Sequence, residues 1–421
     1  MKAHQPISAI ALVDSSPVLV LPSVLALKAT AGEAPVRLRL LGPPHYQSAV
    51  SQLAQIFRRR GIEVHVLEAA RVAESLEDQL SGAWADALAH SGSTQRVLDV
   101  SAAAGGSTAR AIAALERAGA AEHHLVWFSE GSGLVRFLAR PGHTSREIPL
   151  DIGSAESGQP VTPSEFLAIL GLQERLEAPY GAVAEEMLLG AALELLTVYR
   201  ADARWDGVYG TFRQRLRPPG SQKGKKVPFR EMASDEVPLA MRPIVERLAQ
   251  HPGWVVQEGS RFRLTGPDDS AAVFFLSGGW LELVVAEAIR RALPGRHVHV
   301  NLGTSWGHKR QAEAETDVTF IHGNCLYLLS CKNEAVQDRF FPHLDRFRAL
   351  VAEFGESRTR PVLLSTAQLE WRHLQRCAAY EIGAIDGPHL LDSLYESLHG
   401  RPSALLERVL EVSQAPRAGL A

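Results

Sequence analysis

Cysteine is scarce in this chain of 421 residues, which contains only Cys325, Cys331 and Cys377. None of them forms a Cys-x-x-Cys pair, so the sequence argues against a disulfide framework and against a cysteine zinc site. No apolar run approaches the ~20 residues that a membrane-spanning helix needs. The first residues also lack the charged start and apolar core of a secretory signal. These absences predict a cytoplasmic protein with no membrane partner.

Neither sign of charge is in large excess. The chain carries 44 lysines and arginines against 47 aspartates and glutamates, which gives a net charge of −3. No global basic field therefore attracts nucleic acid, and any such contact must depend on a local patch. Residues Arg213–Arg230 contain seven basic side chains among prolines and glycines. This segment suits a solvated loop and a contact with a nucleic-acid backbone equally well.

Apolar sequence in short, regular runs is abundant. Hydrophobic residues make up 46% of the chain and charged residues 22%, as in ordinary globular proteins, and the length suffices for two or three domains. Over residues 1–150, apolar runs of strand length alternate with segments of helical spacing. The expected strands are Ile7–Val13, Val36–Leu41, Glu63–Leu67, Val97–Val100 and His124–Ser129. Such alternation predicts an α/β domain with a mostly parallel sheet.

The middle of the chain is less regular. Residues 151–175 are rich in Gly, Ser and Pro and are expected to form a linker. Pro179–Arg200 has apolar residues at helical spacing, and Pro238–Gln250 predicts a short helix that a hairpin follows. A helix followed by a hairpin is typical of a small winged-helix-like unit. We therefore interpret residues 151–270 as linker and connector.

The last part of the chain predicts a second mixed αβ module. Residues 271–390 are expected to contain a helix over Gly279–Leu293, two adjacent strands over Thr316–His322 and Cys325–Lys332, and further strands and helices. Residues 391–421 are expected to form a C-terminal helix and a tail. The organisation is therefore a sheet domain, a connector, a second sheet domain and a terminal extension.

The two adjacent strands of this module carry the most informative pattern in the sequence. Strand side chains alternate between faces, so Glu315 and Asp317 share a face of the first strand, and Ser330, Lys332 and Glu334 share a face of the second. An acid on one strand and a lysine on the next can hold a divalent metal beside a scissile phosphate. This arrangement is typical of a metal-dependent phosphodiesterase.

Glu282 adds a second acid to this set. It lies early in the helix expected over Gly279–Leu293, among apolar neighbours. The carboxylates of Glu282 and Asp317 would bind Mg²⁺ or Mn²⁺, which prefer oxygen ligands, and Lys332 would orient water or neutralise the phosphate. Each residue alone also has a plainer interpretation: a solvated helix residue, a strand-end residue and an edge-strand lysine that blocks aggregation. Their order and combination favour the catalytic interpretation.

A loop of small residues, Ser101–Thr108, follows the expected strand Val97–Val100 and precedes an apolar helix. Backbone N–H groups at such a helix N-terminus, together with the helix dipole, suit a phosphate. The loop contains neither the Gly-Lys-Ser/Thr of a Walker loop nor a complete Gly-x-Gly-x-x-Gly. On the residues alone, a plain strand-to-helix turn is the slightly better interpretation.

The order of charged residues over about residues 271–385 resembles the PD-(D/E)xK nuclease fold. That fold implies an acid on the first helix, an Asp on a strand and Glu-x-Lys on the next strand. Glu282, Asp317 and Lys332 match these positions, whereas Ser330 stands where the glutamate is expected. Glu315 and Glu334 share the relevant strand faces, and either could compensate for the missing acid. The resemblance also implies that Cys331 lends the metal its backbone carbonyl, so that Glu282, Asp317 and Cys331 would be the metal ligands.

The front of the chain resembles CARF domains, the cyclic-oligonucleotide sensors of type III CRISPR systems. Gly105, Gly106 and Ser107 match the Gly-Gly-Thr of their ligand loop, and Thr108 replaces the lysine that follows. The loop after the first strand, with Ser15 and Ser16, corresponds to their other ligand-facing loop. The resemblance implies that these six residues bind the ligand.

The whole chain resembles ancillary nucleases that join a CARF domain to a PD-(D/E)xK domain. The segment Gly278-Gly279-Trp280-Leu281-Glu282 is similar to their Gly-Gly-Trp-Leu-Glu signature. The resemblance implies a homodimeric endonuclease that cyclic tetra-adenylate activates for cleavage of DNA or RNA. The alternative is a non-catalytic oligoadenylate sensor whose nuclease domain has degenerated, with Ser330 as the trace of that loss.

Overall fold

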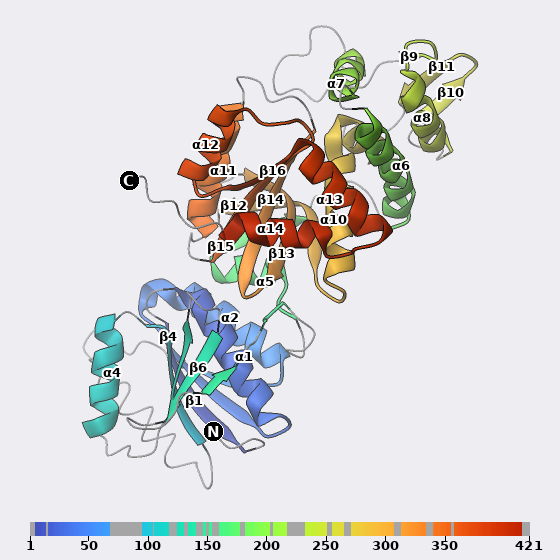
Figure 1. The fold of residues 1–421 in the computed structure, drawn as a ribbon. Helices are drawn as coiled ribbons and strands as arrows, with labels where there is room; N and C mark the ends of the chain where they lie inside the picture. Colours follow the sequence, from blue (N-terminus) through green and yellow to red (C-terminus); the bar gives the residue numbers. More distant parts are fainter. Residues whose placement is uncertain are drawn as a thin grey trace.

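The structure is a computed structural model, and it describes most of the chain. The described residues are 5–13, 16–67, 95–103, 105–117, 124–129, 134–139, 146–148, 151–153, 160–176, 182–202, 205–216, 232–250, 255–264, 271–306, 313–333, 340–354 and 358–414. Over these ranges the chain forms a seven-stranded, a six-stranded and a small three-stranded sheet (Figure 1). Among the helices in these ranges, none is long and apolar enough to cross a bilayer.

The N-terminal part of the chain builds the seven-stranded sheet. Its strands are β1 (Ile7–Val13), β2 (Val36–Leu41), β3 (Glu63–Leu67), β4 (Gln95–Ala102), β5 (His124–Ser129), β6 (Leu134–Ala139) and β7 (Arg146–Ile148). They lie in the order β3-β2-β1-β4-β5-β6-β7; the first five are parallel, β6 pairs antiparallel with β5, and β7 pairs antiparallel with β6. The predicted Rossmann-like layer with a mostly parallel sheet is confirmed.

Helices cover both faces of this sheet, as a parallel sheet requires. Along β1, Ile7 and Ala9 contribute to the core on the side of α1 (Val20–Ala31) and α2 (Gln47–Arg59). Ile10 points to the opposite core, beneath α4 (Gly105–Arg117). Figure 1 shows α4 on the far side of the sheet from α1 and α2. Because both faces are buried, β1 is apolar at nearly every position.

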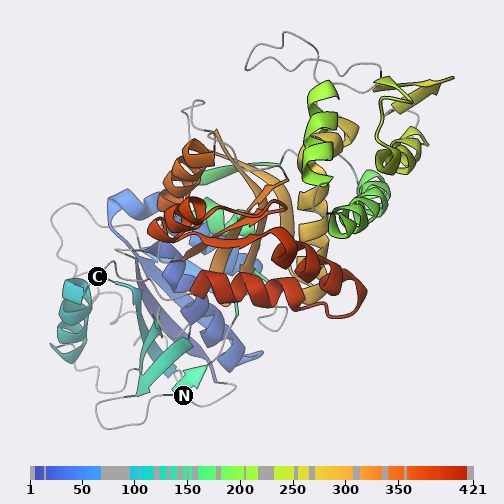
Figure 2. The same cartoon turned by 45° about the horizontal axis from the view of Figure 1, so that its top comes forward.

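The connector, from Ala182 to Leu264, contributes no strand to either large sheet over its described residues. It contains α6 (Ala182–Ala201), α7 (Trp205–Leu216), β9 (Met232–Ala233), α8 (Arg242–Ala249), β10 (Val255–Glu258) and β11 (Arg261–Leu264). Strands β10 and β11 pair as a hairpin after α8, as the sequence predicts, and β9 adds a third strand. Figures 1 and 2 show α7, α8 and the hairpin together at the edge of the molecule, away from the first sheet.

The six-stranded sheet dominates the second half of the chain. Its order is β16-β15-β14-β13-β12-β8, from strands β8 (Leu172–Leu176), β12 (Val298–Trp306), β13 (Glu313–His322), β14 (Cys325–Lys332), β15 (Thr359–Ser365) and β16 (Gly383–Asp386). One face packs against α10 (Trp280–Ala292), α13 (Gly387–His399) and α14 (Ala404–Gln414). The other face packs against α11 (Phe340–Phe354) and α12 (Trp371–Ala379).

The segment expected to be a linker is in part regular structure. Helix α5 (Pro163–Ile169) and strand β8 lie within residues 151–175 and its immediate continuation, and β8 pairs with β12 at the edge of the second sheet. The helix is started by a capping box, in which Thr162 accepts from the N–H of Glu165 and Glu165 accepts from the N–H of Thr162. The Gly- and Pro-rich composition of residues 151–175 favoured a linker, so the capping box was not recognised in the sequence.

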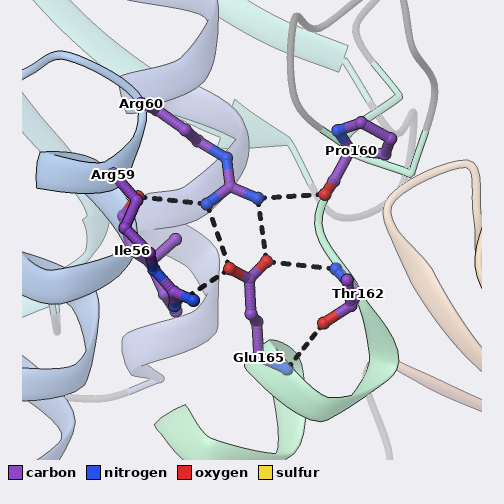
Figure 3. Close-up of polar contacts among 6 residues, drawn as sticks. All are labelled: Ile56, Arg59, Arg60, Pro160, Thr162 and Glu165. Carbon is purple, nitrogen blue, oxygen red and sulfur yellow. Dashed lines mark hydrogen bonds and ion pairs between the residues drawn. The ribbon is translucent and has the colours of Figure 1, made fainter.

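A buried ion pair joins the two halves of the molecule (Figure 3). The guanidinium of Arg60, directly after α2, donates to both carboxylate oxygens of Glu165 on α5, at 3.2 and 2.8 Å. It also donates to the carbonyl oxygen of Pro160 at 3.0 Å, and the more exposed Arg59 reaches the same carboxylate at 3.0 Å. A continuous apolar core runs from the first sheet past α5 to α11. The junction is therefore packed rather than loosely tethered.

Candidate active site

A distorted turn precedes the helix that carries Glu282. Residues Phe275–Gly279 form one wide helical turn, and the regular part of α10 begins at Trp280 rather than at the predicted Gly279. Gly278 has φ 132°, a conformation that side chains with a β-carbon rarely adopt. A β-carbon there would lie 2.5 Å from Nδ2 of Asn333, which donates to the carbonyl oxygen of Gly278 at 3.0 Å. The turn and the end of β14 are thereby fixed to each other.

Aromatic packing holds the start of α10 in place. Trp280 is completely buried, and its ring lies 4.9 Å from the ring of Tyr199 on α6. Tyr209 on α7 donates its hydroxyl to the carbonyl oxygen of Leu276 in the distorted turn, at 3.0 Å. Buried aromatic side chains of this size contribute strongly to core stability. The position of Glu282, two residues after Trp280, is therefore set by the connector helices as well as by the sheet.

Asp317 and the end of β14 form the centre of the site. Oδ2 of Asp317 accepts from the backbone N–H of Cys331 at 2.6 Å and from the hydroxyl of Ser330 at 3.2 Å. Nζ of Lys332 lies 3.5 Å from the same oxygen. Asp317, Ser330 and Lys332 are therefore in contact with one another at the end of β14.

Glu282 approaches from α10, on the opposite face of the sheet. Burial raises the pKa of Glu282 well above its ordinary value, and the negative charges of Asp317 and Glu315 raise this pKa further. Oε2 of Glu282 is buried and has no hydrogen-bond partner within the described part of the chain. A buried acid whose ionisation is disfavoured, and one of whose oxygens has no partner among the described residues, makes a site that a cation would stabilise.

The sequence did not draw attention to His343. This residue lies on α11, and its Nε2 is 3.0 Å from the hydroxyl of Ser330. Burial, together with the charge of Lys332, lowers the pKa of His343 to about 4. A signal was available, because His343 lies three residues after the buried Phe340 and four before the buried Phe347. Helical periodicity therefore places it on the inward side of the helix.

The residues present fit a hard divalent cation with few protein ligands. Over the described ranges, no group of three or more His, Cys, Asp and Glu side chains is placed to hold a metal ion. The available donors are the carboxylates of Glu282 and Asp317 and the backbone carbonyl of Cys331, which is predicted to be a ligand. Burial raises the pKa of the Cys331 thiol well above its usual range, so this sulfur stays protonated and is a poor ligand. Mg²⁺ suits such a set because it commonly binds through one or two carboxylates and keeps several waters.

The predicted sensor residues lie at a topological switch point of the first sheet. Strands β1 and β4 are neighbours, and the strand order reverses between them. Ser16 follows the end of β1, and Gly105, Gly106, Ser107 and Thr108 form the first turn of α4 directly after β4. Gly105 and Gly106 were expected before the helix, which begins earlier than predicted. Ligands of parallel sheets bind at such a crevice, beyond the carboxyl ends of the strands.

Ser15, the remaining predicted sensor residue, lies outside the described residues.

A buried carboxylate supports the end of β4. Asp99 is fully buried and accepts from the N–H and the hydroxyl of Ser101, at 2.9 and 2.5 Å, and from the hydroxyl of Ser23 on α1. The hydroxyl of Ser101 in turn accepts from the N–H of Phe128 at 2.9 Å. Burial raises the pKa of Asp99 to about 6. This network ties the strand end that precedes the predicted sensor turn to α1 and β5.

The sequence of the second sheet domain matches a known family. Residues 269–401 match the model of the family described as Card1-like, endonuclease domain. This part of the chain is therefore similar in sequence to a Card1-like endonuclease domain. The matched range includes Glu282, Asp317, Ser330, Lys332 and His343. The match supports nuclease function for the domain in which the two acids and the lysine converge.

The fold of the whole chain is similar to solved structures. Protein VC1899 from Vibrio cholerae shares 17% identity with a TM-score of 0.62, over 95% of this chain and 98% of that one. Can2 from Sulfobacillus thermosulfidooxidans, solved in complex with cyclic tetra-adenylate, shares 16% identity with a TM-score of 0.58, over 96% and 99%. At this identity the likeness establishes the fold. Among curated proteins, no significant match was found. The two comparisons together bear out the predicted resemblance to CARF-domain ancillary nucleases.

Proposed function

We propose that this chain is a metal-dependent endonuclease that cleaves phosphodiester bonds of DNA or RNA and is activated by cyclic tetra-adenylate in antiviral type III CRISPR defence. The grouping of Glu282, Asp317 and Lys332 carries the proposal. Glu282 has a buried oxygen with no partner among the described residues, the charge of Asp317 raises the pKa of Glu282, and Lys332 lies 3.5 Å from Asp317. The match of the same segment to an endonuclease family supports it.

The chemistry follows from the charges of these side chains. When bound, Mg²⁺ or Mn²⁺ supplies Lewis-acid polarisation of the scissile phosphate and of the attacking water. The carboxylates of Glu282 and Asp317 would hold this metal ion from opposite faces of the sheet. Lys332 contributes a point charge 3.5 Å from Asp317 that can neutralise a phosphate oxygen or orient water. Stabilisation of charge that develops in the transition state is commonly the largest catalytic contribution.

Activation is assigned to the first sheet domain. Ser15, Ser16 and the Gly105–Thr108 turn are proposed to bind cyclic tetra-adenylate, and the complex in which Can2 was solved supports this ligand class. Two copies of one crevice related by a two-fold axis match a cyclic ligand of near two-fold symmetry, so we propose a homodimer. Activation then requires that the ligand binds the active arrangement more tightly than the inactive one.

The proposal is tested by incubating labelled single-stranded DNA, single-stranded RNA and supercoiled plasmid with the purified protein and Mn²⁺, with and without cyclic tetra-adenylate. We expect cleavage of at least one substrate that the ligand stimulates. Asp317→Ala and Lys332→Ala should abolish cleavage and leave ligand binding intact. If either variant cuts as fast as the parent, the active site is misassigned.

One observation favours a second candidate, a sensor whose nuclease domain no longer cleaves. Ser330 occupies the position at which the resemblance implies a metal-binding glutamate, and its partner His343 supplies no negative charge. Such a protein would bind oligoadenylate and show no cleavage under any of these conditions. Appearance of metal-dependent cleavage only in Ser330→Glu would favour this candidate, whereas strong cleavage by the parent would remove it.

A further inference from the structure

We propose that Ser330 and His343 together replace the missing acidic residue, as a neutral relay that positions Asp317 for the cation. This inference rests on the proposed metal-dependent function and concerns a residue, His343, that no motif of the sequence includes. Its basis is one chain of contacts from α11 to β13. Nε2 of His343 lies 3.0 Å from Oγ of Ser330, and Oγ of Ser330 lies 3.2 Å from Oδ2 of Asp317.

The direction of the relay follows from a count of protons. A serine hydroxyl has one hydrogen to donate, and an ionised carboxylate has none. The hydrogen between Ser330 and Asp317 therefore belongs to Ser330, and the hydrogen between Ser330 and His343 must come from Nε2 of the imidazole. The tautomer is assigned by this count: Nε2 of His343 is protonated and donates to Ser330, which donates to Asp317.

Three donors then converge on one oxygen of Asp317. Oδ2 accepts hydrogen bonds from the hydroxyl of Ser330 and the backbone N–H of Cys331, and the ammonium of Lys332 lies 3.5 Å away. Within the described part of the chain, no hydrogen bond or ion pair is made to Oδ1. The relay thus fixes the rotation of the carboxylate and leaves Oδ1 as the oxygen offered to a cation. Orientation of a metal ligand by such an outer hydrogen bond is typical of metal sites.

The ring of His343 is itself held in orientation. It lies nearly parallel to the ring of Phe347, one helical turn further along α11, with 6.4 Å between centroids and 14° between planes. Helix α11 is anchored by Phe340, Leu344 and Phe354, which are buried in the core shared with the first sheet domain. The relay therefore connects the site to a rigid element rather than to a loop.

The test measures binding of Mn²⁺ alone to the full chain, by the loss of the free Mn²⁺ signal in electron paramagnetic resonance. Ser330→Ala and His343→Ala should each weaken Mn²⁺ affinity by about 10-fold, the lower end of what removal of an outer partner costs. Because both act through one relay, the double variant should also lose about 10-fold rather than about 100-fold. His343→Gln, whose amide can donate from near the Nε2 position, should recover most of the affinity.

Two controls make the result specific. His389→Ala, an exposed histidine on α13, should leave Mn²⁺ affinity unchanged. Asp317→Ala should abolish binding, and if it does not, the proposed metal site fails along with the relay. If Asp317→Ala abolishes binding while the two single variants bind like the parent, the relay is wrong and the proposed function stands. Additive losses in the double variant, or a loss in His343→Ala with none in Ser330→Ala, would show that His343 contacts the cation directly and would also overturn the relay.

Discussion

Glu282 is the residue at which stability and function oppose each other. Burial and the neighbouring carboxylates raise its pKa, so the folded protein holds a proton at Glu282 over a pH range in which the unfolded chain has already released it. The group therefore stabilises the fold most at low pH, and this contribution falls as the pH rises through the folded-state pKa. At neutral pH without metal, Glu282 costs stability. A bound cation would remove that cost.

Substitution of Glu282 by Gln should therefore change stability and activity in opposite directions. We expect Glu282→Gln to raise the midpoint of thermal unfolding in metal-free buffer at pH 7–8, and to lose the further rise that Mn²⁺ gives the parent. Cleavage should fall by about 100-fold or more, because several kcal/mol of metal-derived stabilisation are lost. Glu287→Gln, which removes an ion pair with Arg291 on the same helix, is the control and should do neither. A less stable Glu282→Gln variant would contradict this account.

Asp99 provides a pH-dependent prediction in the first sheet domain. Its pKa rises from 3.8 to about 6 on burial, so its contribution to stability falls between these two values as the pH increases. At 1.36 kcal/mol per pKa unit, the fall amounts to about 3 kcal/mol. We expect the free energy of unfolding of Asp99→Asn, relative to that of the parent, to increase by about this amount between pH 4 and pH 7, as measured by denaturant titration. An unchanging difference between the two proteins across this range would show that Asp99 titrates normally.

At the residue level, the sequence predicted the acids and the lysine but not their supporting partners. Glu282, Asp317 and Lys332 could be singled out as candidates because their chemistry and order are unusual in combination. His343 and Asn333 act through hydrogen bonds to Ser330 and Gly278, which are distant or unremarkable in the sequence. Contacts of this kind depend on the relative placement of helix and strand, and a single sequence does not specify that placement.

Among the elements, the distorted turn before α10 has the strictest requirement for its sequence. Gly278→Ala would place a β-carbon at φ 132° and 2.5 Å from Nδ2 of Asn333. We expect a loss of about 2 kcal/mol or more in the free energy of unfolding, together with lower cleavage, because Glu282 follows directly. Gly207→Ala in α7 meets no atom within 4 Å and should be neutral or slightly stabilising. Chemical denaturation of both variants makes the comparison, and equal stability of the two would contradict it.

Element boundaries were predictable where local pattern and tertiary structure agree. Strand β14 begins and ends where the sequence predicted, since its apolar run is fully buried. The linker prediction for residues 151–175 missed α5 and β8, because β8 gains its stability from pairing with β12, more than 120 residues later. The seven basic residues of Arg213–Arg230 divide between the end of α7 and a segment outside the described residues, so their role stays a prediction.

On the scale of the whole molecule, polar contacts as well as the shared apolar core join the first sheet domain to the second. One is the Arg60–Glu165 pair between α2 and α5. In another, the guanidinium of Arg358 lies 3.9 Å from the ring centre of Phe128, whose N–H bonds to Ser101 at the end of β4. The carbonyl oxygen of Arg358 also accepts from Leu326 at the start of β14. A continuous set of contacts thus runs from the predicted sensor crevice to the strand that carries Lys332.

The two arginines that share Glu165 allow a matched test of the junction. The Arg60 side chain is 5% exposed and that of Arg59 is 59% exposed. Breaking a buried pair is costly, so Arg60→Ala should lower the free energy of unfolding by about 3 kcal/mol, whereas Arg59→Ala should cost less than about 1 kcal/mol. We also expect Arg60→Ala to reduce the stimulation of cleavage by cyclic tetra-adenylate. Equal effects of the two substitutions would show that the junction does not depend on the buried pair.

The central claim is that Glu282 and Asp317 hold one divalent cation between them, and diffraction from crystals soaked in Mn²⁺ tests it most directly. An anomalous difference map should show one peak per chain, about 2.0–2.6 Å from Oδ1 of Asp317 and from a carboxylate oxygen of Glu282. Absence of that peak in crystals of protein that cleaves nucleic acid, or a peak in other surroundings, would contradict the claim.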